Sequence, residues 1–313
     1  MNVLVYMEEK EGVAVPASLE ALGAAQTLGT VKAAAIGSAK AAQAAADYGI
    51  PAILAKTGDA SADAQVAALE AIVKEEKPDV VLFAATQLGK DLAPRLAQRF
   101  EAGCVTDATW VENSEQGLVF TRPAYGGTVL ERLKVESALA VATVRGGSYS
   151  KPQPAQTALI TEKEIVPAPE TLRAQVKEVV HEITEAVDLE GADVIVAGGR
   201  GMGDAEHFKL VEELAALLGG VVGASRPAIE EGWISRTHQI GQSGKIVAPK
   251  LYIACGISGA MQHISGAMGA KYIVAINKDE AASIFNVADV GIVGDVREIL
   301  PMLIEAIREQ KQS

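Results

Sequence analysis

Residues 251–277, LYIACGISGAMQHISGAMGAKYIVAIN, are the stretch that most constrains what this chain can fold into. They begin with an apolar run at 251–255, break at a glycine turn over 256–259, continue as a short helix-like segment at 260–267 and end in a second apolar run at 272–276. A buried strand, a glycine turn, a helix and a second buried strand in this order are typical of a parallel sheet. Because ligands of such sheets sit beyond the carboxyl ends of the strands, we expect a binding crevice at this turn.

The residues that follow the expected strands of the C-terminal half extend this prediction to a whole sheet edge. We expect these strands at 193–197, 221–224, 251–255, 272–276 and 290–293. They are followed by GGRGMG (198–203), Ser225 and Arg226, Ser258 and His263, Asn277, and Asp295. A right-handed parallel arrangement brings all of these to one edge. The glycine run alone is weak evidence for a ligand site, because it does not match Gly-x-Gly-x-x-Gly and no acidic residue follows the next strand.

Bulk properties exclude several classes of partner. A chain of 313 residues with 49% hydrophobic and 22% charged residues fits about two ordinary globular domains. Its formal net charge of -12 argues against nucleic acid and against an anionic membrane surface, both of which attract basic proteins. No apolar run approaches the roughly 18 residues of a spanning helix, and the first strand starts at residue 2 without a signal segment, so we expect a cytoplasmic protein with no membrane insertion.

The first hundred residues alternate between strand and helix patterns, which predicts an α/β fold with a parallel sheet. We expect strands at 2–7, 31–36, 52–55 and 80–85, and helices at 16–28, 38–48, 63–74 and 90–101. Strands at 106–111, 118–121, 129–135 and 139–144 are expected next, as partly antiparallel additions at the sheet edge.

A proline-rich stretch at 150–170, with one possible short strand at 157–160, is typical of a domain linker. We therefore place one domain at 1–165 and a second at 166–313. The second domain repeats the alternation, with helices expected at 204–218 and 296–309 and a turn or short helix at 229–233.

The order Leu-Tyr-Ile-Ala-x-Gly-Ile-Ser-Gly-x-x-Gln-His, then Gly266, then Ile-Val-Ala-Ile-Asn, closely resembles the signature of the electron transfer flavoprotein alpha subunit family. The resemblance extends through GGRGMG (198–203), GASRP (223–227), QIGQSGK (239–245) and Asp295, so it is firm in the C-terminal half and looser in the N-terminal half. It implies two α/β domains, each a mostly parallel sheet flanked by helices, with a Rossmann-like FAD-binding domain at the C-terminus.

The same resemblance implies the residues that contact FAD. Arg226 looks like the arginine over the isoalloxazine ring, His263 like the histidine at its pyrimidine carbonyl, and Ser243 stands where relatives carry a hydrogen-bonding threonine or serine. The full predicted set is Arg200, Gly201, Ser225, Arg226, Gln239, Ile240, Gly241, Gln242, Ser243, Gly256, Ile257, Ser258, Gly259, Ala260, Met261, Gln262, His263, Asn277, Asp295 and Val296. Among these, backbone N–H groups near Ser258 suit a pyrophosphate, and Asn277 and Asp295 suit ribose or adenine.

A positive charge and hydrogen-bond donors near a flavin stabilise its negative reduced forms by Coulomb attraction. Arg226 can supply a planar permanent charge and His263 a donor that is stronger when protonated. The alternatives stay open for each residue: a surface ion pair for Arg226, a structural histidine for His263, and a solvated serine in a glycine turn for Ser243.

The family's first domain packs mainly against a beta subunit. Residues 121–127 (TRPAYGG) and 144–149 (VRGGSY) are candidate features of that surface, with plain strand-end turns as the alternative. We expect no metal site, because Cys104 and Cys255 lack ligand spacing and so do His181, His207 and His238.

These observations predict an electron carrier rather than an enzyme. It would hold FAD and pair with a beta subunit that contains AMP or a second flavin. It would accept electrons from flavin dehydrogenases of the acyl-CoA type, as in fatty acid β-oxidation, and deliver them to a quinone reductase or another acceptor. One alternative is the alpha subunit of an NADH-dependent bifurcating flavoprotein. Others are a colourless nucleotide-binding regulatory or deacylating protein, and a purely structural subunit.

Overall fold

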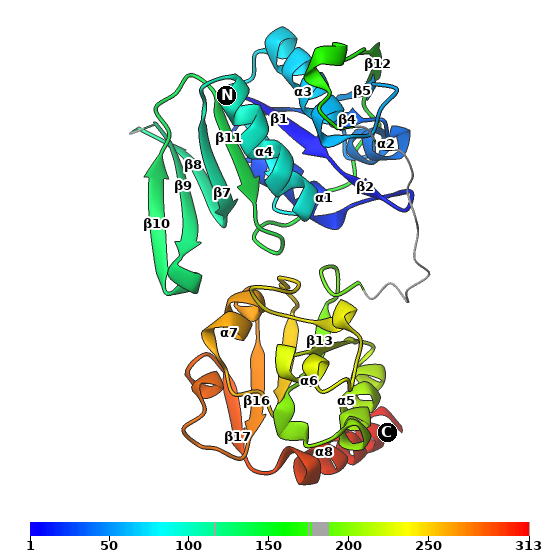
Figure 1. Ribbon diagram of the computed structural model, residues 1–313, viewed down its shortest axis with the longest axis vertical. Helices are drawn as coiled ribbons and strands as arrows, with labels where there is room; N and C mark the ends of the chain where they lie inside the picture. The colour runs from blue at the N-terminus through cyan, green and yellow to red at the C-terminus, as the bar shows by residue number, and fades with distance from the viewer. Residues whose placement is uncertain (116, 175, 177–187, 313) are drawn as a thin grey trace. The chain divides into compact units, whose positions relative to one another are not determined.

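The computed structural model describes residues 1–115, 117–174, 176 and 188–312 (Figure 1). The chain divides into two compact units, residues 1–181 and 182–313. In the described part of the chain, no helix is long and apolar enough to cross a membrane. The α/β class with two sheets flanked by helices is therefore confirmed, whereas the domain boundary at 165/166 stays a prediction.

The first unit is built on a seven-stranded parallel sheet with the order β12-β5-β4-β1-β6-β11-β7. Helices α1 and α2 cover one face of this sheet, and α3 and α4 cover the other (Figure 1). Each pair of helices packs on its face through one cluster of buried apolar residues. The strands are β1 (Asn2–Met7), β4 (Thr30–Ile36), β5 (Ala52–Lys56), β6 (Val80–Ala84), β7 (Gly103–Ala108), β11 (Ala140–Val144) and β12 (Ile160–Glu164). The helices are α1 (Pro16–Gln26), α2 (Ala39–Ala46), α3 (Ala62–Glu76) and α4 (Gln87–Arg99), and a small hairpin is formed by β2 (Glu9–Lys10) and β3 (Val13–Ala14).

The predicted additions at the sheet edge are only partly right. β8 (Trp110–Ser114), β9 (Gly117–Ala124) and β10 (Val129–Lys134) form a separate antiparallel sheet, as the antiparallel prediction allows. β11, however, is wholly buried and lies inside the parallel sheet between β6 and β7. The strand predicted at 106–111 is in fact the end of β7 and the start of β8, which are separated at Thr109. Asp107 lies within β7 in a left-handed conformation with φ of 63°, where the pairing of β7 with β11 shifts its register.

Part of the predicted linker also belongs to the first sheet. β12 pairs in parallel with β5 at the edge, three residues later than the short strand expected at 157–160. Its side chains are mostly exposed, so no apolar alternation marks it in the sequence. The backbone N–H groups of Arg173 and Ala174 then donate to the Asp63 carboxylate in the first turn of α3. Residues 175 and 177–187, which include His181, lie outside the described part.

Thr86 caps α4 in the first unit and offers a test of this architecture. Its hydroxyl accepts from the backbone N–H of Gly89 at 2.9 Å and donates to the Glu8 carboxylate at the end of β1. We expect Thr86→Ala to lower the free energy of unfolding by about 1–2 kcal/mol, because the variant loses the hydroxyl that accepts from the Gly89 N–H and donates to the Glu8 carboxylate. Urea denaturation checks this. Thr86→Ser keeps the hydroxyl and should stay within about 0.5 kcal/mol of wild type; an equal loss in both variants would contradict the capping role.

The second unit carries a five-stranded parallel sheet with the order β14-β13-β15-β16-β17. Its strands are β13 (Val194–Gly198), β14 (Val221–Ala224), β15 (Leu251–Cys255), β16 (Ile273–Asn277) and β17 (Val290–Val293), all five of which the sequence predicted within one residue. Its helices are α5 (Ala205–Leu218), α6 (Arg226–Glu230), α7 (Met261–Ala267) and α8 (Val296–Gln312). Residues of α5 and α8 build the apolar cluster on one face and residues of α7 contribute to the cluster on the other.

The strand order fixes where a ligand can bind in this unit. From β13 the chain moves to β14 on one side of the sheet, and then to β15, β16 and β17 on the other. The connections that follow β13 and β15 therefore lead to opposite faces of the sheet, through α5 and α7, and such a switch point is where a crevice opens at the carboxyl ends of the strands.

Candidate functional site

A cavity of about 880 Å³ lies at this edge of the second sheet. It brings together nearly all the residues that the sequence singled out, from five different strand ends. These are Arg200, Gly201, Ser225, Arg226, Gln239, Ile240, Gly241, Gln242, Ser243, Gly256, Ile257, Ser258, Ala260, Gln262, His263, Asn277, Asp295 and Val296. The predicted residues Gly259 and Met261 are not part of its lining: Gly259 packs against the backbone of Ile284, and the Met261 side chain is exposed.

Several lining residues were missed from the sequence. The cavity wall also contains Pro227, Glu230, Lys278, Asp279, Ala281, Ala282 and Ser283. Most of them directly follow Asn277, so extending the strand-end argument beyond a single residue at the end of β16 would have included them. Glu230 lies one helical turn after Arg226 on α6, and this spacing was available as a signal.

Glycines let the loops after β13 and β15 touch through their backbones. The Gly201 N–H donates to the Gly256 carbonyl at 2.9 Å, and the Gly199 N–H donates to the Cys255 carbonyl at 2.8 Å. A Cβ atom on Gly201 would lie 2.7 Å from the Gly256 Cα, and one on Gly256 would lie 2.8 Å from Gly201. Gly256 also needs a positive φ of 62°, which side chains disfavour. A side chain at either position would collide with the other loop, and both glycines line the cavity.

The loop 239–245 crosses the carboxyl end of the sheet and is tied to both sides of the crevice. The Ile240 N–H donates to the Ala224 carbonyl of β14 at 2.9 Å, and the Gln242 N–H donates to the Gln262 carbonyl of α7 at 2.7 Å. Ser243 is exposed on this loop, and its hydroxyl accepts from the Gln239 side-chain amide at 3.0 Å. The loop therefore presents a hydroxyl group to the cavity from an anchored backbone.

Arg226 opens α6 and lines the cavity with a largely exposed side chain. Its Nε group donates to the Glu230 carboxylate at 2.7 Å, an i, i+4 ion pair. The ion pair considered as the alternative is therefore present. This ion pair uses one of the five N–H groups of the guanidinium. The other N–H groups can still donate to a ligand in the cavity.

His263 is the buried polar side chain of the site, and its environment corrects one expectation. It comes from α7, is 7% exposed, and its Nε2 atom lies 2.8 Å from the Tyr252 hydroxyl oxygen of β15. Burial lowers the pKa of His263 to about 4, and the Ile240 carbonyl opposes this only in part. The ring is therefore neutral near pH 7, so in this structure it offers a neutral donor and not the additional positive charge that the sequence analysis considered.

The Nδ1 atom of His263 is buried and has no hydrogen-bond partner of acceptable geometry among the described residues. An unpaired buried polar atom is costly in a folded protein, and such atoms point to a missing ligand or water. Because His263 lines the cavity, a ligand there can supply the partner.

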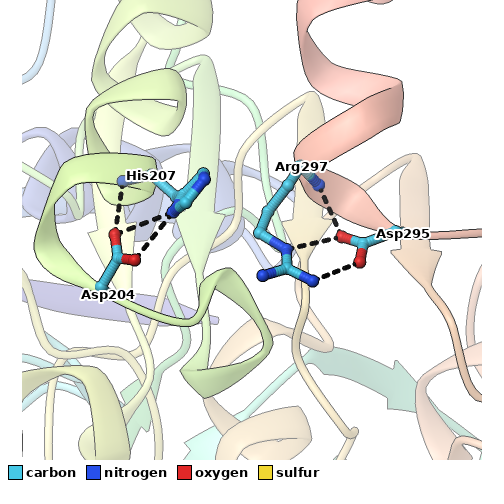
Figure 2. A network of polar contacts seen from close by, with 4 residues as sticks. All are labelled: Asp204, His207, Asp295 and Arg297. Carbon is cyan, nitrogen blue, oxygen red and sulfur yellow. Dashed lines mark hydrogen bonds and ion pairs between the residues drawn. The ribbon is translucent and has the colours of Figure 1, made fainter.

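Two neighbouring polar pairs, Asp295 with Arg297 and Asp204 with His207, lie beyond the ends of β17 and β13 (Figure 2). Arg297 donates to both carboxylate oxygens of Asp295, from Nε at 3.0 Å and from Nη2 at 2.6 Å. These hydrogen bonds hold the pKa of Asp295 well below its usual range, so the group stays ionised and can only accept hydrogen bonds. Asp204 caps α5 and contacts the His207 ring, and its charge also acts on Arg297.

Asn277 holds two loops together at the end of β16. Its side-chain amide donates to the Ile257 carbonyl at 2.9 Å, and its side-chain oxygen accepts from the Asp279 N–H at 3.0 Å. Asn277 thus shapes the cavity wall through protein contacts, and its predicted contact with ribose or adenine stays a prediction. Within the described ranges, no group of three or more His, Cys, Asp or Glu residues could hold a metal ion.

A doubly wound parallel sheet with glycine loops around a crevice at the switch point defines a dinucleotide-binding α/β domain. A model of the electron transfer flavoprotein FAD-binding domain matches residues 188–268, and a model of the electron transfer flavoprotein domain matches residues 3–171. The chain belongs to the electron transfer flavoprotein alpha subunit family, and FAD is the cofactor of its C-terminal domain.

Similar proteins support this placement along nearly the whole chain. The electron transfer flavoprotein subunit alpha of Bacillus subtilis is 39% identical over 98% of this chain and 98% of its own length. The subunit of the same name from Megasphaera elsdenii is 46% identical over 76% of this chain and 72% of its own length. A protein of Anaerotignum propionicum named acryloyl-CoA reductase electron transfer subunit beta is 38% identical over 80% of this chain and 77% of its own length.

Proposed function

We propose that this chain is the FAD-holding subunit of a heterodimeric electron carrier, and that the cavity at residues 200–296 is where the FAD binds. The observation that carries this proposal is that Arg226 and His263 line the same cavity, and that the buried Nδ1 atom of His263 is unpaired among the described residues. An extended dinucleotide fits there for three reasons. The cavity is large, glycine backbone at residues 201, 241 and 256 forms part of its lining, and its polar groups come from different strand ends.

When bound, FAD supplies a ring that takes up and releases electrons. The chain's own residues position that ring and set its surroundings. Arg226 provides a permanent positive charge, His263 provides a hydrogen-bond donor in a desolvated position, and Ser243 provides a hydroxyl on an anchored loop. The backbone at Gly201 and Ser258 lines the cavity where no side chain crowds a phosphate. Each of these groups binds or orients, so the chemistry asked of the protein is that of a carrier and not of an enzyme.

We propose the partners from the family and from the names of the relatives. Alpha subunits of this family pair with beta subunits, and the name of the Anaerotignum propionicum protein joins electron transfer to the reduction of an acyl-CoA. A flavin dehydrogenase of the acyl-CoA type is therefore the proposed donor, as in fatty acid β-oxidation, and a quinone reductase is the proposed acceptor. That the protein works in the cytoplasm stays a prediction.

The surface for the beta subunit is proposed on the first unit at residues 121–127 and 144–149. The first of these comprises the end of β9 and the turn toward β10 at residues 125–127, where Tyr125 is 81% exposed with a left-handed φ of 50°. A large aromatic side chain held out in a strained turn suits a contact with another protein better than a plain strand-end turn does.

The visible spectrum of the chain co-purified with its beta subunit tests the function. One flavin per heterodimer, reduced by an acyl-CoA dehydrogenase with its substrate, would support the carrier proposal. Two flavins, with NADH oxidised by the heterodimer, would replace it by the bifurcating alternative. A colourless complex that takes up no FAD when FAD is added would overturn it in favour of the nucleotide-binding or structural alternatives.

Arg226→Ala tests the proposed charge beside the ring. We expect the midpoint potential of the bound FAD to fall by about 60–120 mV, equivalent to about 1.4–2.8 kcal/mol for one electron, because the reduced ring loses a nearby positive charge. A spectroscopic titration against redox dyes measures this. Arg236→Ala removes an exposed arginine of the same unit that does not line the cavity, and it should leave the potential unchanged. Equal shifts in the two variants would mean that only the net charge of the protein matters.

A further inference from the structure

We propose that Tyr252 is a positioning residue for the flavin site. Its hydroxyl group fixes His263 in the tautomer that carries the ring proton on Nδ1, so the imidazole presents a hydrogen-bond donor to the cavity. The tautomer follows from the packing of this chain alone. Its role toward FAD rests on the function proposed above.

The first argument concerns the hydrogen on the Tyr252 hydroxyl. This side chain is fully buried on the α7 face of β15, and His263 Nε2 at 2.8 Å is the partner that the described residues provide for its hydroxyl. Burial raises the pKa of Tyr252, so the hydroxyl keeps its hydrogen. If Nε2 carried the imidazole proton and donated to the tyrosine oxygen, the tyrosine O–H would be buried without an acceptor. If the tyrosine donates to Nε2, this cost disappears.

The second argument is independent and concerns the other side of the ring. The Ile240 carbonyl acts on the His263 ring in the sense that favours its protonation. A carbonyl oxygen attracts an N–H group and repels a nitrogen lone pair, so it favours a proton on the ring nitrogen that it faces. Nε2 lies against Tyr252, which leaves Nδ1 as that nitrogen, and Nδ1 has no hydrogen-bond partner among the described residues.

The consequence is a fixed donor at the point where the resemblance places the pyrimidine carbonyl of a flavin. Histidine ring nitrogens take their roles from the hydrogen bond made by the other nitrogen. Tyr252 touches the histidine and lies behind it, so it acts on the ligand only through His263. Without the hydroxyl group, an imidazole with a lone pair on Nδ1 would repel the carbonyl oxygen of the ring instead of binding it.

The tautomer can be observed directly by NMR on the full chain labelled with ¹⁵N-histidine, before FAD is added. The chain has four histidines, and the His263 signals are the ones that vanish in His263→Gln. We expect the wild type to show Nδ1 as the protonated nitrogen and Nε2 as the unprotonated one. Wild-type spectra with the proton on Nε2 would overturn the proposal, whatever any variant of Tyr252 does.

Tyr252→Phe removes the hydroxyl and keeps the ring that packs against α7. We expect roughly a tenfold loss of the preference for the Nδ1–H tautomer, which is the effect of losing one ordinary hydrogen bond. In the heterodimer, the midpoint potential of the bound FAD should fall as well. Tyr6→Phe is the matched control, because it removes a buried hydroxyl that bonds Gln65 in the first unit, and it should change neither reading. An unchanged tautomer ratio in Tyr252→Phe would refute the positioning role.

The two proposals fail in different ways. If the chain takes up no FAD but His263 carries its proton on Nδ1, the proposed function fails and the effect of Tyr252 on the histidine stands. If FAD binds but the wild-type proton is on Nε2, the positioning role fails and the carrier function stands.

Discussion

Gly256→Ala is expected to abolish FAD binding and to lower the free energy of unfolding of the second unit by about 3 kcal/mol. Two costs combine at this position. The residue has a φ of 62°, which costs an L-residue about 1–2 kcal/mol, and its new Cβ would stand 2.8 Å from the Gly201 backbone. The loops after β13 and β15 must then separate, and the hydrogen bond from the Gly201 N–H to the Gly256 carbonyl is lost with them.

Gly219→Ala is the matched control for this prediction. Gly219 ends α5 with a nearly identical φ of 65°, but nothing lies within 4 Å of the position that a Cβ would take. It should therefore show the conformational cost alone, about 1 kcal/mol, and should bind FAD normally. Trp233 fluorescence in a Trp110→Phe background reports on the second unit during urea denaturation, because these are the two tryptophans of the chain. Equal losses in both variants would show that φ, and not the backbone crossing, sets the cost.

The stability of the second unit without FAD is expected to depend on pH through His263. The folded pKa is about 4, against 6.5 for the free side chain. Between these pH values the unfolded chain binds the proton more readily than the folded chain does. The contribution of the neutral buried ring to the free energy of unfolding is therefore fully present above pH 6.5. It falls as the pH is lowered and is lost by pH 4, for a total of about 3 kcal/mol.

Urea denaturation followed through Trp233 at several pH values measures this dependence. The carboxylates of Asp204 and Asp295 do not interfere, because their pKa values are lowered from 3.8 and they titrate below this window. His263→Gln has no proton to gain and should flatten the profile between pH 4 and 6.5. Parallel profiles in wild type and variant would mean that the ring is more accessible to water than its burial indicates.

The sequence was informative wherever burial leaves a local pattern. β1, β6, β13 and β15 are largely apolar runs, and each was predicted within one residue. The bounds of β12 were not predicted, because its side chains are mostly exposed and its sequence therefore shows no alternation of apolar and polar residues. β11 was recognised as a strand but misplaced, because its neighbours β6 and β7 are chosen by packing between distant segments, which a local pattern does not record.

The candidate site shows the same division. The strand-end argument and the family motifs together predicted residues from all five strand ends of the cavity, since chain direction in a parallel sheet alone brings those ends to one edge. The same argument left out residues 278–283, because it stopped at the last residue of β16. Gly259 and Met261 were included because they lie within the motif, although one packs against Ile284 and the other faces solvent.

The sequence by itself determined the α/β class, the family, the cofactor and the positions where glycine is required. Only the tertiary structure decided the chemical state of the groups around the cavity. His263 is neutral because it is buried against Tyr252. Arg226 forms an ion pair with Glu230, and Asn277 holds the loop at Ile257 by a hydrogen bond. The reason is physical: a pKa, a tautomer and an ion pair depend on distances between residues far apart in the chain, and the order of residues fixes these only through the completed fold.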